Sequence, residues 1–549
     1  MGTKYKIWNN LSSKKAKDLD ELHAIVHKNR DFKELDELKY DDEKLEIAVK
    51  AINKAILQNK KIALYADYDV DGTMSCTSWI WFLKEINYTN FTYYIPDRFK
   101  EGYGLNLEAV QTLVKNHGAE IIITMDTGIT ANKEAEWCRS QGIDFVCTDH
   151  HKIQADQIPD AIILNPKCNP DPMYQELCGC GITFVLLRRL AQSYSVSQSL
   201  WSDLLALAGM ATICDLVPLN PVNHRIARLG VKALLKSKRP VLQKLIKKAL
   251  DSNTDLDEQD IGFKLGPRIN AVGRMAHSHK VIEAFVDDKI DSLLDFMEIC
   301  NDKRKKIQQE IIDEACDLAV PKNDDPILFL GGNWHQGVVG IAASRLVDEF
   351  WKPVWLFEEN KKTGICKGSA RSIQGFDITE AMVQSKIYFD KFGGHQAAGG
   401  FSFAIEKKDL VHKSLLEYAS NIKKSHPNLW ISSIDYDCEL SPSLLNINIF
   451  QLFEQLKPFG FGFKEPLFTI EFKIHKCQFY YDKVTNKPKH TCVFVKTDEE
   501  KNLKIIFFNN VYTSLQQATK AYFLVTIQKN KWQGNISLNL IGHDYKVSE

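Results

Sequence analysis

The feature that most constrains the fold is a regular alternation of short apolar runs and amphipathic segments, which begins at Lys61. The apolar runs are β-prone and are predicted as strands: 62–66, 91–95, 121–125, 144–147 and 161–164. The segments between them, such as LNLEAVQTLVKN, repeat their apolar residues with a helical period. Alternation of this kind predicts an α/β fold with a doubly wound parallel sheet. Functional groups in such a fold lie in the crevice at the carboxyl ends of the strands.

The chain has 549 residues, which is too long for a single hydrophobic core. At roughly 150 residues per domain, it is expected to contain about three or four domains. Residues 1–55 are charged and helix-prone, so we predict a helical lead-in that packs on the first α/β domain at 56–280. A mostly helical connector at 281–322 precedes a second α/β unit at 323–428. Short alternating strands broken by turn signals predict a small all-β barrel or sandwich at 429–549.

The charge balance excludes some classes of protein. Lys and Arg number 70 and Asp and Glu number 70, so the formal net charge is zero. A globally basic nucleic-acid coat or a highly charged disordered chain is excluded, whereas local basic grooves are compatible with this balance. No apolar run approaches the ~20 residues of a membrane helix, so no membrane association is expected. The 13 cysteines are scattered along the chain and lack the spacing of zinc ligands. This pattern predicts that the protein resides in a reducing cytoplasm.

The densest group of carboxylates is ADYDVDG, directly after the first predicted strand. Asp67, Asp69 and Asp71 occupy alternate positions and repel one another, so a bound cation is the natural reason for them. A calcium loop of the D-x-D-x-D-G type is the rival interpretation. It is disfavoured because Ser78 stands where that loop needs a Glu, and because a strand rather than a helix precedes.

Further candidate ligands follow other apolar runs: Asp126, Asp149, His150, His151 and Asp215. Each has an ordinary alternative, since Asp126 could cap a helix, the histidines could lie on the surface and Asp215 could form an ion pair. Together they predict an oxygen-rich site that favours manganese or magnesium over zinc. Two such ions ~3.5–4 Å apart suit in-line displacement at a phosphodiester, so we infer metal-assisted phosphoester hydrolysis.

Several motifs carry a family resemblance. The segments ADYDVDGTMS, TMDTGIT, TDHH and ATICDLVPL resemble, in this order, the four motifs of the DHH phosphoesterases. GPRINAVGRM (266–275), GSARSIQGFD (368–377) and FGGHQAAGGF (392–401) resemble the DHHA1-containing part of the RecJ family of bacterial single-strand-specific DNA exonucleases. PFGFGFKEPLF (458–468) resembles the segment that opens the OB-like domain of that family. The resemblance implies a DHH domain, a long connecting helix, a DHHA1 domain and an OB-like nucleic-acid-binding domain.

The resemblance also implies a two-metal centre. One ion, Mn²⁺ or Mg²⁺, would be held by Asp69, Asp126, His150 and Asp215. Asp67, sharing Asp69 and Asp126, would hold or support the other. Smaller relatives place a metal-ligand histidine four residues before the first motif aspartate, where this chain has Ala63. This departure implies a weaker metal site, or one that fills only with substrate.

Other motif positions are implied to contact the substrate. His151 would polarise the scissile phosphate or handle a proton, with Asp149 orienting the histidine loop and Asp71 acting indirectly. His395 would approach the scissile phosphate across the cleft, with a turn histidine as the alternative. Arg274 would act beside the metals.

The remaining site residues would hold the strand. Arg98, Ser369 and Arg371 would grip the terminal 5′-phosphate, which gives 5′-to-3′ polarity. Arg268, Asn270 and Arg274 would contact the DNA backbone, with bridging of the two domains as the alternative.

Some features stay open. Trp334 and His335 could line the groove or pack under the following helix, and the basic run 225–248 could track DNA or be a solvated helix. Phenylalanines spaced by two, at 459, 461 and 463, are more typical of a core than of a binding surface. The better candidates for stacking bases are Tyr480, Tyr481 and Trp532, near Lys483, Lys487, Lys489 and Lys531.

The expected function is a metal-dependent 5′-to-3′ exonuclease that degrades single-stranded DNA to mononucleotides by two-metal hydrolysis, in DNA repair and recombination. A cytoplasmic monomer is implied, with a single-strand-binding protein and a RecQ-type helicase as partners. The alternative is a DHH phosphodiesterase for short oligonucleotides or cyclic dinucleotides, but such enzymes resemble only the two α/β units. A catalytically inactive replication scaffold would have lost motif aspartates that are present here.

Overall fold

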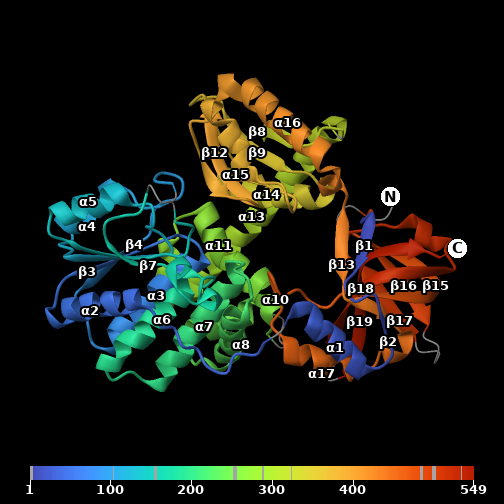
Figure 1. Ribbon diagram of the computed structural model, residues 1–549, viewed down its shortest axis with the longest axis horizontal. Helices are drawn as coiled ribbons and strands as arrows, with labels where there is room; N and C mark the ends of the chain where they lie inside the picture. Colours follow the sequence, from blue (N-terminus) through green and yellow to red (C-terminus); the bar gives the residue numbers. More distant parts are fainter. Residues whose placement is uncertain are drawn as a thin grey trace.

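The chain folds into three units, and the first lies beside both of the others (Figure 1). The computed structural model describes residues 4–31, 33–102, 104–153, 157–250, 256–286, 290–322, 324–482, 486–496, 502–532 and 535–548. In Figure 1 the first unit runs from blue to green, the second is yellow to orange, and the third is red. Helix α13 (Ile290–Ala319) connects the first unit to the second, as the predicted long helical connector requires.

The first unit is built on a parallel sheet with strand order β4-β3-β5-β6-β7. Its strands are β3 (Ile62–Ala66), β4 (Phe91–Tyr94), β5 (Ile121–Met125), β6 (Asp144–Thr148) and β7 (Ile162–Leu164). The chain reverses direction across the sheet between β3 and β5, which are neighbours. This point is where open α/β sheets bind ligands. The predicted doubly wound sheet is confirmed.

Helices cover both faces of this sheet. Alternate β3 residues pack with α2 and α3 on one face and with α4 and α5 on the other. The helices of the first unit are α2 (Glu43–Leu57), α3 (Val70–Glu85), α4 (Leu107–Lys115), α5 (Asn132–Ser140), α6 (Gly179–Leu190), α7 (Gln198–Cys214), α8 (Pro221–Lys236), α9 (Pro240–Ala249), α10 (Glu258–Asp260), α11 (Gly266–Met275) and α12 (His279–Val286). A π-helix, Ile261–Leu265, joins α10 to α11.

The second unit has a mixed sheet with strand order β11-β12-β10-β9-β8, in which only β8 and β9 are parallel. Its strands are β8 (Leu328–Gly332), β9 (Val354–Asn360), β10 (Ile365–Arg371), β11 (Lys391–His395) and β12 (Ala398–Ala404). Its helices are α14 (Gln336–Phe350), α15 (Ile378–Gln384) and α16 (Lys408–Ser425). The predicted second α/β unit is confirmed.

The third unit is a closed barrel. Its strands follow the order β15-β16-β17-β19-β18, and β15 pairs with both β16 and β18 to close the sheet. They are β15 (Phe468–Tyr481), β16 (Pro488–Lys496), β17 (Asn502–Phe507), β18 (Lys520–Trp532) and β19 (Asn535–Val547). Helix α17 (Ile449–Leu456) precedes the barrel. This is the architecture of an OB-like barrel, so the predicted small barrel is confirmed.

The amino-terminal segment belongs to the third unit, so its predicted packing on the first domain is wrong. Strand β1 (Ile7–Asn10) pairs with β13 (Ser433–Tyr436), and β2 (Lys15–Ala16) pairs with β14 (Cys438–Leu440). In Figure 1 this blue segment, with α1 (Leu19–Arg30), lies beside the red barrel. Helix α2 packs on the first unit as predicted, and Tyr40, just before it, meets Tyr174 of that unit edge-on.

Buried polar contacts anchor this segment. Arg30 makes two hydrogen bonds to the carboxylate of Asp437, at 2.6 and 3.0 Å. Asp544, fully buried, accepts hydrogen bonds from the backbone of Lys4 and Tyr5 and from the indole of Trp8. Removing one partner of a buried charge pair costs roughly 3–5 kcal/mol, so these contacts fix the segment on the barrel.

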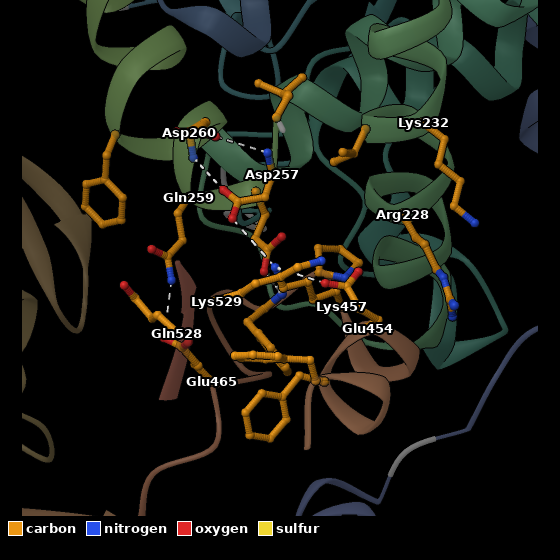
Figure 2. A pocket seen from close by; sticks show the side chains of 18 of the residues that line it. Arg228, Lys232, Asp257, Gln259, Asp260, Glu454, Lys457, Glu465, Gln528 and Lys529 are labelled. Atoms are coloured by element: carbon orange, nitrogen blue, oxygen red, sulfur yellow. Dashed lines mark hydrogen bonds and ion pairs between the residues drawn. The ribbon is translucent and has the colours of Figure 1, made fainter. Parts of the chain in front are cut away.

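A cavity of about 740 Å³ lies between the first unit and the barrel (Figure 2). Lys457 lies within 3.6 Å of Asp257 and 3.8 Å of Glu454. Gln259 donates to Glu465 at 3.2 Å. The charged groups that join the two units in Figure 2 therefore have partners across the interface.

None of the helices in the described part of the chain is both long and apolar enough to cross a membrane.

Candidate metal centre and phosphate-binding cleft

The predicted ligands converge where parallel strands end. Asp67 follows β3 and Asp126 follows β5, the two neighbours at the switch point. The backbone N–H of Asp67 donates to Met125 O at 3.2 Å, and that of Asp126 donates to Thr148 O at 3.0 Å. These bonds continue the sheet pairing past the strand ends. Asp126 has a positive φ of 59°, which turns the chain at this point.

Three overlapping groups of side chains could each hold a metal ion. They are Asp67 with Asp69 and Asp126, Asp71 with His150 and Asp215, and Asp126 with His150 and His151. Within each group the ligand atoms all lie within 4.8 Å of one another. The predicted ligands Asp67, Asp69, Asp126, His150 and Asp215 are thus brought together. His150 Nε2 is 3.1 Å from Asp126 Oδ1 and 3.5 Å from Asp215 Oδ2.

The electrostatics of this cluster call for a cation. Burial, and then repulsion from Asp69, raises the pKa of Asp67 well above its usual value. Burial, and then repulsion from Asp71, likewise raises the pKa of Asp126 and of Asp215. Burial, and then the charge of His151, lowers the pKa of His150 to about 3, so its imidazole is neutral at pH 7. A neutral imidazole among carboxylates is a metal ligand rather than an ion-pair partner.

Unpartnered atoms point the same way. Asp67 Oδ1, Asp126 Oδ1 and His150 Nε2 are buried and make no hydrogen bond within the described residues. Leaving such atoms unpaired is costly, so each one needs an explanation. Divalent ions such as Mn²⁺ or Mg²⁺ would pair with them, because carboxylate oxygens with imidazole are their usual ligands. The residues present fit the implied metals.

The surroundings of Asp71 include a residue that the sequence did not reveal. Asp71 is fully buried and accepts from the backbone N–H groups of Gly179, at 2.5 Å, and Cys180, at 2.7 Å, which open α6. Burial, and then repulsion from Asp69, raises the pKa of Asp71 to about 7. A side chain at Gly179 would lie 2.8 Å from Asp126 Cβ, so only glycine fits. The run CGCG at 178–181 contains this glycine. The spacing of the sequence does not show, however, that the backbone of Gly179 approaches a carboxylate from another element.

The second histidine is held by Asp149. His151 Nδ1 lies 2.7 Å from Asp149 Oδ1, and Asp149 also accepts from the backbone of His151 and Ile129. Burial opposes a charged ring, but the hydrogen bond from Asp149 and the negative charges of Asp149, Asp67 and Asp69 together outweigh burial, so the pKa of His151 is raised. His395 comes from β11 of the second unit and stacks near His151, with ring centroids 6.4 Å apart. His395 therefore reaches the metal centre from across the cleft.

Three arginines gather beside the carboxylate cluster: Arg98, Arg274 and Arg371. Burial, and then repulsion from Arg98 and Arg371, lowers the pKa of Arg274 to about 10. None of the three forms an ion pair with a carboxylate in the described part of the chain. Ser369 Oγ and Arg371 Nη2 lie together over Gly340 of α14, at 3.2 and 3.1 Å from the position of an added Cβ. Mutually repelling guanidinium groups with a nearby hydroxyl are suited to a phosphate.

Comparisons with known proteins agree with this geometry. The DHH family, N-terminal domain, matches residues 61–212, the DHHA1 domain matches 324–421, and the RecJ OB domain matches 436–544. The chain is 32% identical over 459 residues to the single-stranded-DNA-specific exonuclease RecJ of Escherichia coli, covering 78% of each chain. The chain belongs to the RecJ family.

Other members of the RecJ family show the same relationship. The chain is 31% identical over 512 residues to the Bacillus subtilis exonuclease, covering 91% of this chain but only 63% of that relative. The crystal structure of Thermus thermophilus RecJ in complex with Mn²⁺ superposes with a TM-score of 0.84 at 22% identity, covering 99% of this chain and 80% of that one. An exonuclease RecJ bound to manganese gives 0.60 at 25% identity, covering 70% and 96%.

Some predicted RecJ-family contacts have other partners here. Arg268 donates to Glu298 on α13 and to Lys264 O, so it joins the first unit to the connecting helix. Asn270 accepts from the backbone N–H of Val70 at 3.0 Å and steadies the first motif. Arg274 donates to Gly337 O at 3.0 Å, across to the second unit. That these residues contact the DNA backbone stays a prediction.

The open positions of this RecJ-family chain are placed as follows. Trp334 is buried, and its indole donates to Glu314 at 2.8 Å, so it packs under α14. His335 caps α14 through a bond from Gly337 N and meets Phe99 edge-on across the cleft. Ala63 is fully buried in the middle of β3.

Four of the nine Lys and Arg residues of the basic run 225–248 form ion pairs. Arg239 pairs with Asp203, Lys244 with Asp291 and Lys248 with Asp295. Arg228 also reaches Glu34, at 3.2 Å. These four ion pairs join α8 and α9 to their neighbours, and both interpretations of the run, a DNA-tracking face and a solvated helix, stay predictions.

The barrel aromatics divide into two classes. Phe459 and Phe463 are buried, as expected for a core, but Phe461 between them is 60% exposed. Tyr480 and Tyr481 are exposed on β15. Lys483 and the side chains of Lys531 and Trp532 lie outside the described residues.

Proposed function

We propose that this chain is a metal-dependent 5′-to-3′ exonuclease that degrades single-stranded DNA to mononucleotides, in DNA repair and recombination. The observation that carries the proposal is that two unbalanced charge clusters of opposite sign lie side by side. Buried carboxylates with unpartnered oxygens lie on the first unit, and three arginines without carboxylate partners lie next to them. A phosphodiester with divalent ions would neutralise both clusters. The names of the relatives, single-stranded-DNA-specific exonucleases, support this substrate.

Two divalent ions, Mn²⁺ or Mg²⁺, are proposed as cofactors. Asp69, Asp126, His150 and Asp215 would hold one, and Asp67 with Asp69 and Asp126 would hold the other. When bound, such ions lower the pKa of water and stabilise charge on phosphate oxygens. The packing of Ala63 supports a weaker hold on the ion at Asp67, because no imidazole is supplied from β3.

The chain's own residues would order the reacting groups. Asp149 fixes Nδ1 of His151, so the ring would meet the scissile phosphate through Nε2 and hold a proton there. Asp71, bound to the N-terminus of α6, would orient His150 and Asp215 without giving up its backbone bonds. His395 and Arg274 would stabilise the phosphate from the cleft side.

The polarity would come from the end-binding group. Arg98, Ser369 and Arg371 would hold a 5′-phosphate, and this grip would place the next phosphodiester at the metals. One nucleotide would then leave in each cycle, with a 5′-phosphate and a 3′-hydroxyl. The barrel would hold the strand further along, where exposed Phe461, Tyr480 and Tyr481 are suited to stacking bases.

Partners and location are also proposed. We infer that a single-strand-binding protein and a RecQ-type helicase supply the substrate, which is supported by family membership. A cytoplasmic location is supported by the free thiols of all 13 cysteines, which are typical of a reducing compartment. A monomer is supported because residues of one chain supply every proposed ligand.

The test uses single strands labelled at the 5′ or the 3′ end, with Mn²⁺. The 5′ label should leave at once as a mononucleotide, while the 3′ label stays on progressively shorter strands. Early release of the 3′ label would contradict the polarity. A dinucleotide cleaved far faster than a long strand would instead favour a phosphodiesterase of short oligonucleotides.

A further inference from the structure

The sheet of the second unit presents regular rows of side chains to the cleft. Register pairs Arg371 on β10 with Ala398 on β12, which pairs in turn with His395 on β11. This row reaches the metal centre, because His395 stacks near His151. Residues two apart on a strand point to the same face, so the rows on either side can be assigned by counting.

The next row away from the metals contains Ser369. It pairs with Gly400, which pairs with Gly393. A Cβ added at either glycine would meet nothing within 4 Å, so the floor beside Ser369 is open. This open floor is where the proposed 5′-phosphate would lie.

One row further on, the face becomes basic. Lys367 pairs with Ser402, which pairs with Lys391. Two residues of a β-strand span about 6.7 Å. Lys367 and Lys391 therefore lie about this far beyond the row that contains Ser369. A DNA strand whose single 5′-phosphate is held at Ser369 would leave the lysines of this row without a phosphate to bind.

The lysine row opens on a cavity of about 640 Å³, which Arg98, Lys100 and Ser369 also line. Pockets that enclose whole small molecules measure about 300–1,000 Å³, so the space exceeds what one phosphate requires. Lys100, Lys367 and Lys391 form no ion pair within the described residues.

The carboxylates near this cavity are engaged elsewhere. Glu101 lines it, but its oxygens accept from Tyr94, Asn106 and the backbone of Asp97. Glu358, the β9 neighbour of Lys367, accepts from Gln336 at 2.7 Å. Four cations line the cavity, Arg98, Lys100, Lys367 and Lys391, against the one carboxylate of Glu101, so the lining carries a net charge of about +3, which a single phosphate dianion does not balance.

We propose that this cavity receives 5′ ends that carry two or three phosphates in series. The inference rests on the proposed exonuclease function and extends its substrate range. The α-phosphate takes the place of the 5′-phosphate at Ser369 and Arg371, and the β- and γ-phosphates extend toward Lys367 and Lys391. Lysine ammonium groups bind phosphate as mobile point charges, which suits a flexible chain of phosphates.

The cleavage step itself is unchanged. Water adds to the scissile phosphorus, the bond to the 3′-oxygen of the first nucleotide breaks, and that oxygen takes the proton. The first product is a nucleoside triphosphate with a 3′-hydroxyl, and the shortened strand begins with a 5′-monophosphate. Every later cycle releases a mononucleotide.

The test compares otherwise identical single strands that begin with a 5′-triphosphate, a 5′-monophosphate or a 5′-hydroxyl. The variant combines Lys367→Ala and Lys391→Ala. The control combines Lys361→Ala and Lys362→Ala, which removes the same charge from exposed lysines in the β9–β10 turn. All four lysines are exposed, so folding should be preserved. First-cycle kcat/KM and product identity are measured with Mn²⁺, and Kd is measured in EDTA on the Asp126→Asn background.

The wild type should release a nucleoside triphosphate, with kcat/KM within about tenfold of that on the monophosphate strand. The cavity variant should lose about tenfold in kcat/KM and in affinity on the triphosphate strand, and less than about threefold on the monophosphate strand. Equal losses on both strands, or a triphosphate strand that binds no better than the hydroxyl strand, would overturn the inference. If the monophosphate strand is not degraded, the proposed function fails, and the EDTA affinities still decide the inference.

Discussion

The first unit meets two neighbours, and the two interfaces differ in how their charges are balanced. Toward the second unit, Arg98, Arg274 and Arg371 repel one another beside carboxylates that also repel one another. Toward the barrel, the larger cavity has Lys457 between Asp257 and Glu454, and Gln259 bonded to Glu465. The first interface groups like charges without counter-ions, whereas the second contains paired charges together with one buried carboxyl, Glu465, that Glu258 repels.

The difference shows that cavity size does not locate the chemistry of this molecule. The cavity at the barrel is about 740 Å³ and the one beside Ser369 is about 640 Å³, yet only the smaller one adjoins groups that need a ligand. An uncompensated buried charge destabilises a folded protein. Such charges are therefore expected mainly where binding or catalysis needs them. Substitutions at the metal centre should therefore change activity strongly, whereas substitutions at the barrel interface should change stability and leave activity nearly unchanged.

The largest effect is expected from Asp126→Asn. Removing one carboxylate ligand should lower kcat/KM on single-stranded DNA by about 10³-fold or more. Without metal, the same change should raise the free energy of unfolding by about 1 kcal/mol, because it relieves repulsion that raises the pKa of Asp126. Nucleotide release with Mn²⁺ and urea unfolding in EDTA measure the two effects.

Asp313→Asn, on the exposed side of α13, is the matched control and should change neither quantity. Activity of Asp126→Asn within tenfold of wild type would show that the metal assignment is wrong. A free energy of unfolding of Asp126→Asn in EDTA that is lower than that of the wild type would show that repulsion among the carboxylates does not destabilise the folded protein.

Arg371→Ala should have the next largest effect. A charge-assisted contact to phosphate is lost, so kcat/KM on a 5′-phosphorylated strand should fall about 10–100-fold. A 5′-hydroxyl strand offers no such contact, and its loss should be under about threefold. The exposed Arg345→Ala on α14 is the control. Equal losses on both strands would mean that Arg371 does not bind the strand end.

Glu465→Gln tests the paired interface through its pH dependence. Burial, and then repulsion from Glu258, raises the pKa of Glu465 to about 7 in the folded protein. A raised carboxyl pKa means that the folded state binds more protons, so stability should fall as pH rises from about 4.5 to 7 and then level off. The Gln variant should lack this fall, which we expect to be about 2 kcal/mol.

Urea unfolding between pH 5 and 8, with hydrogen exchange of residues 458–467, measures this effect. Glu454→Gln, on the exposed rim of the same cavity, is the control and should shift stability by less than about 0.5 kcal/mol. Nuclease activity should change less than twofold in either variant. A stability curve of Glu465→Gln that falls as steeply as that of the wild type would contradict the assignment.

Some features of this molecule could be predicted from the sequence, and others could not. Most of the metal ligands could be predicted because they follow strands whose period is local, as with Asp67 after β3 and Asp126 after β5. Asp215 is different, because the apolar run before it is helix α7 rather than a strand. The place of β1 could not be predicted, because Ile7 pairs with Ser433 and no local pattern encodes so distant a partner. Gly179 was missed for the same reason, since its backbone serves a carboxylate from another element.

The smallest effect is expected from combining Lys244→Ala with Lys248→Ala in the basic run. Each lysine pairs with an aspartate of α13, so its charge is already offset. The Kd for single-stranded DNA should change less than twofold, and its salt dependence should stay the same. Fluorescence anisotropy at several salt concentrations measures both. A flatter salt dependence would show that these lysines contact phosphates, and that paired charges of this chain also bind the strand.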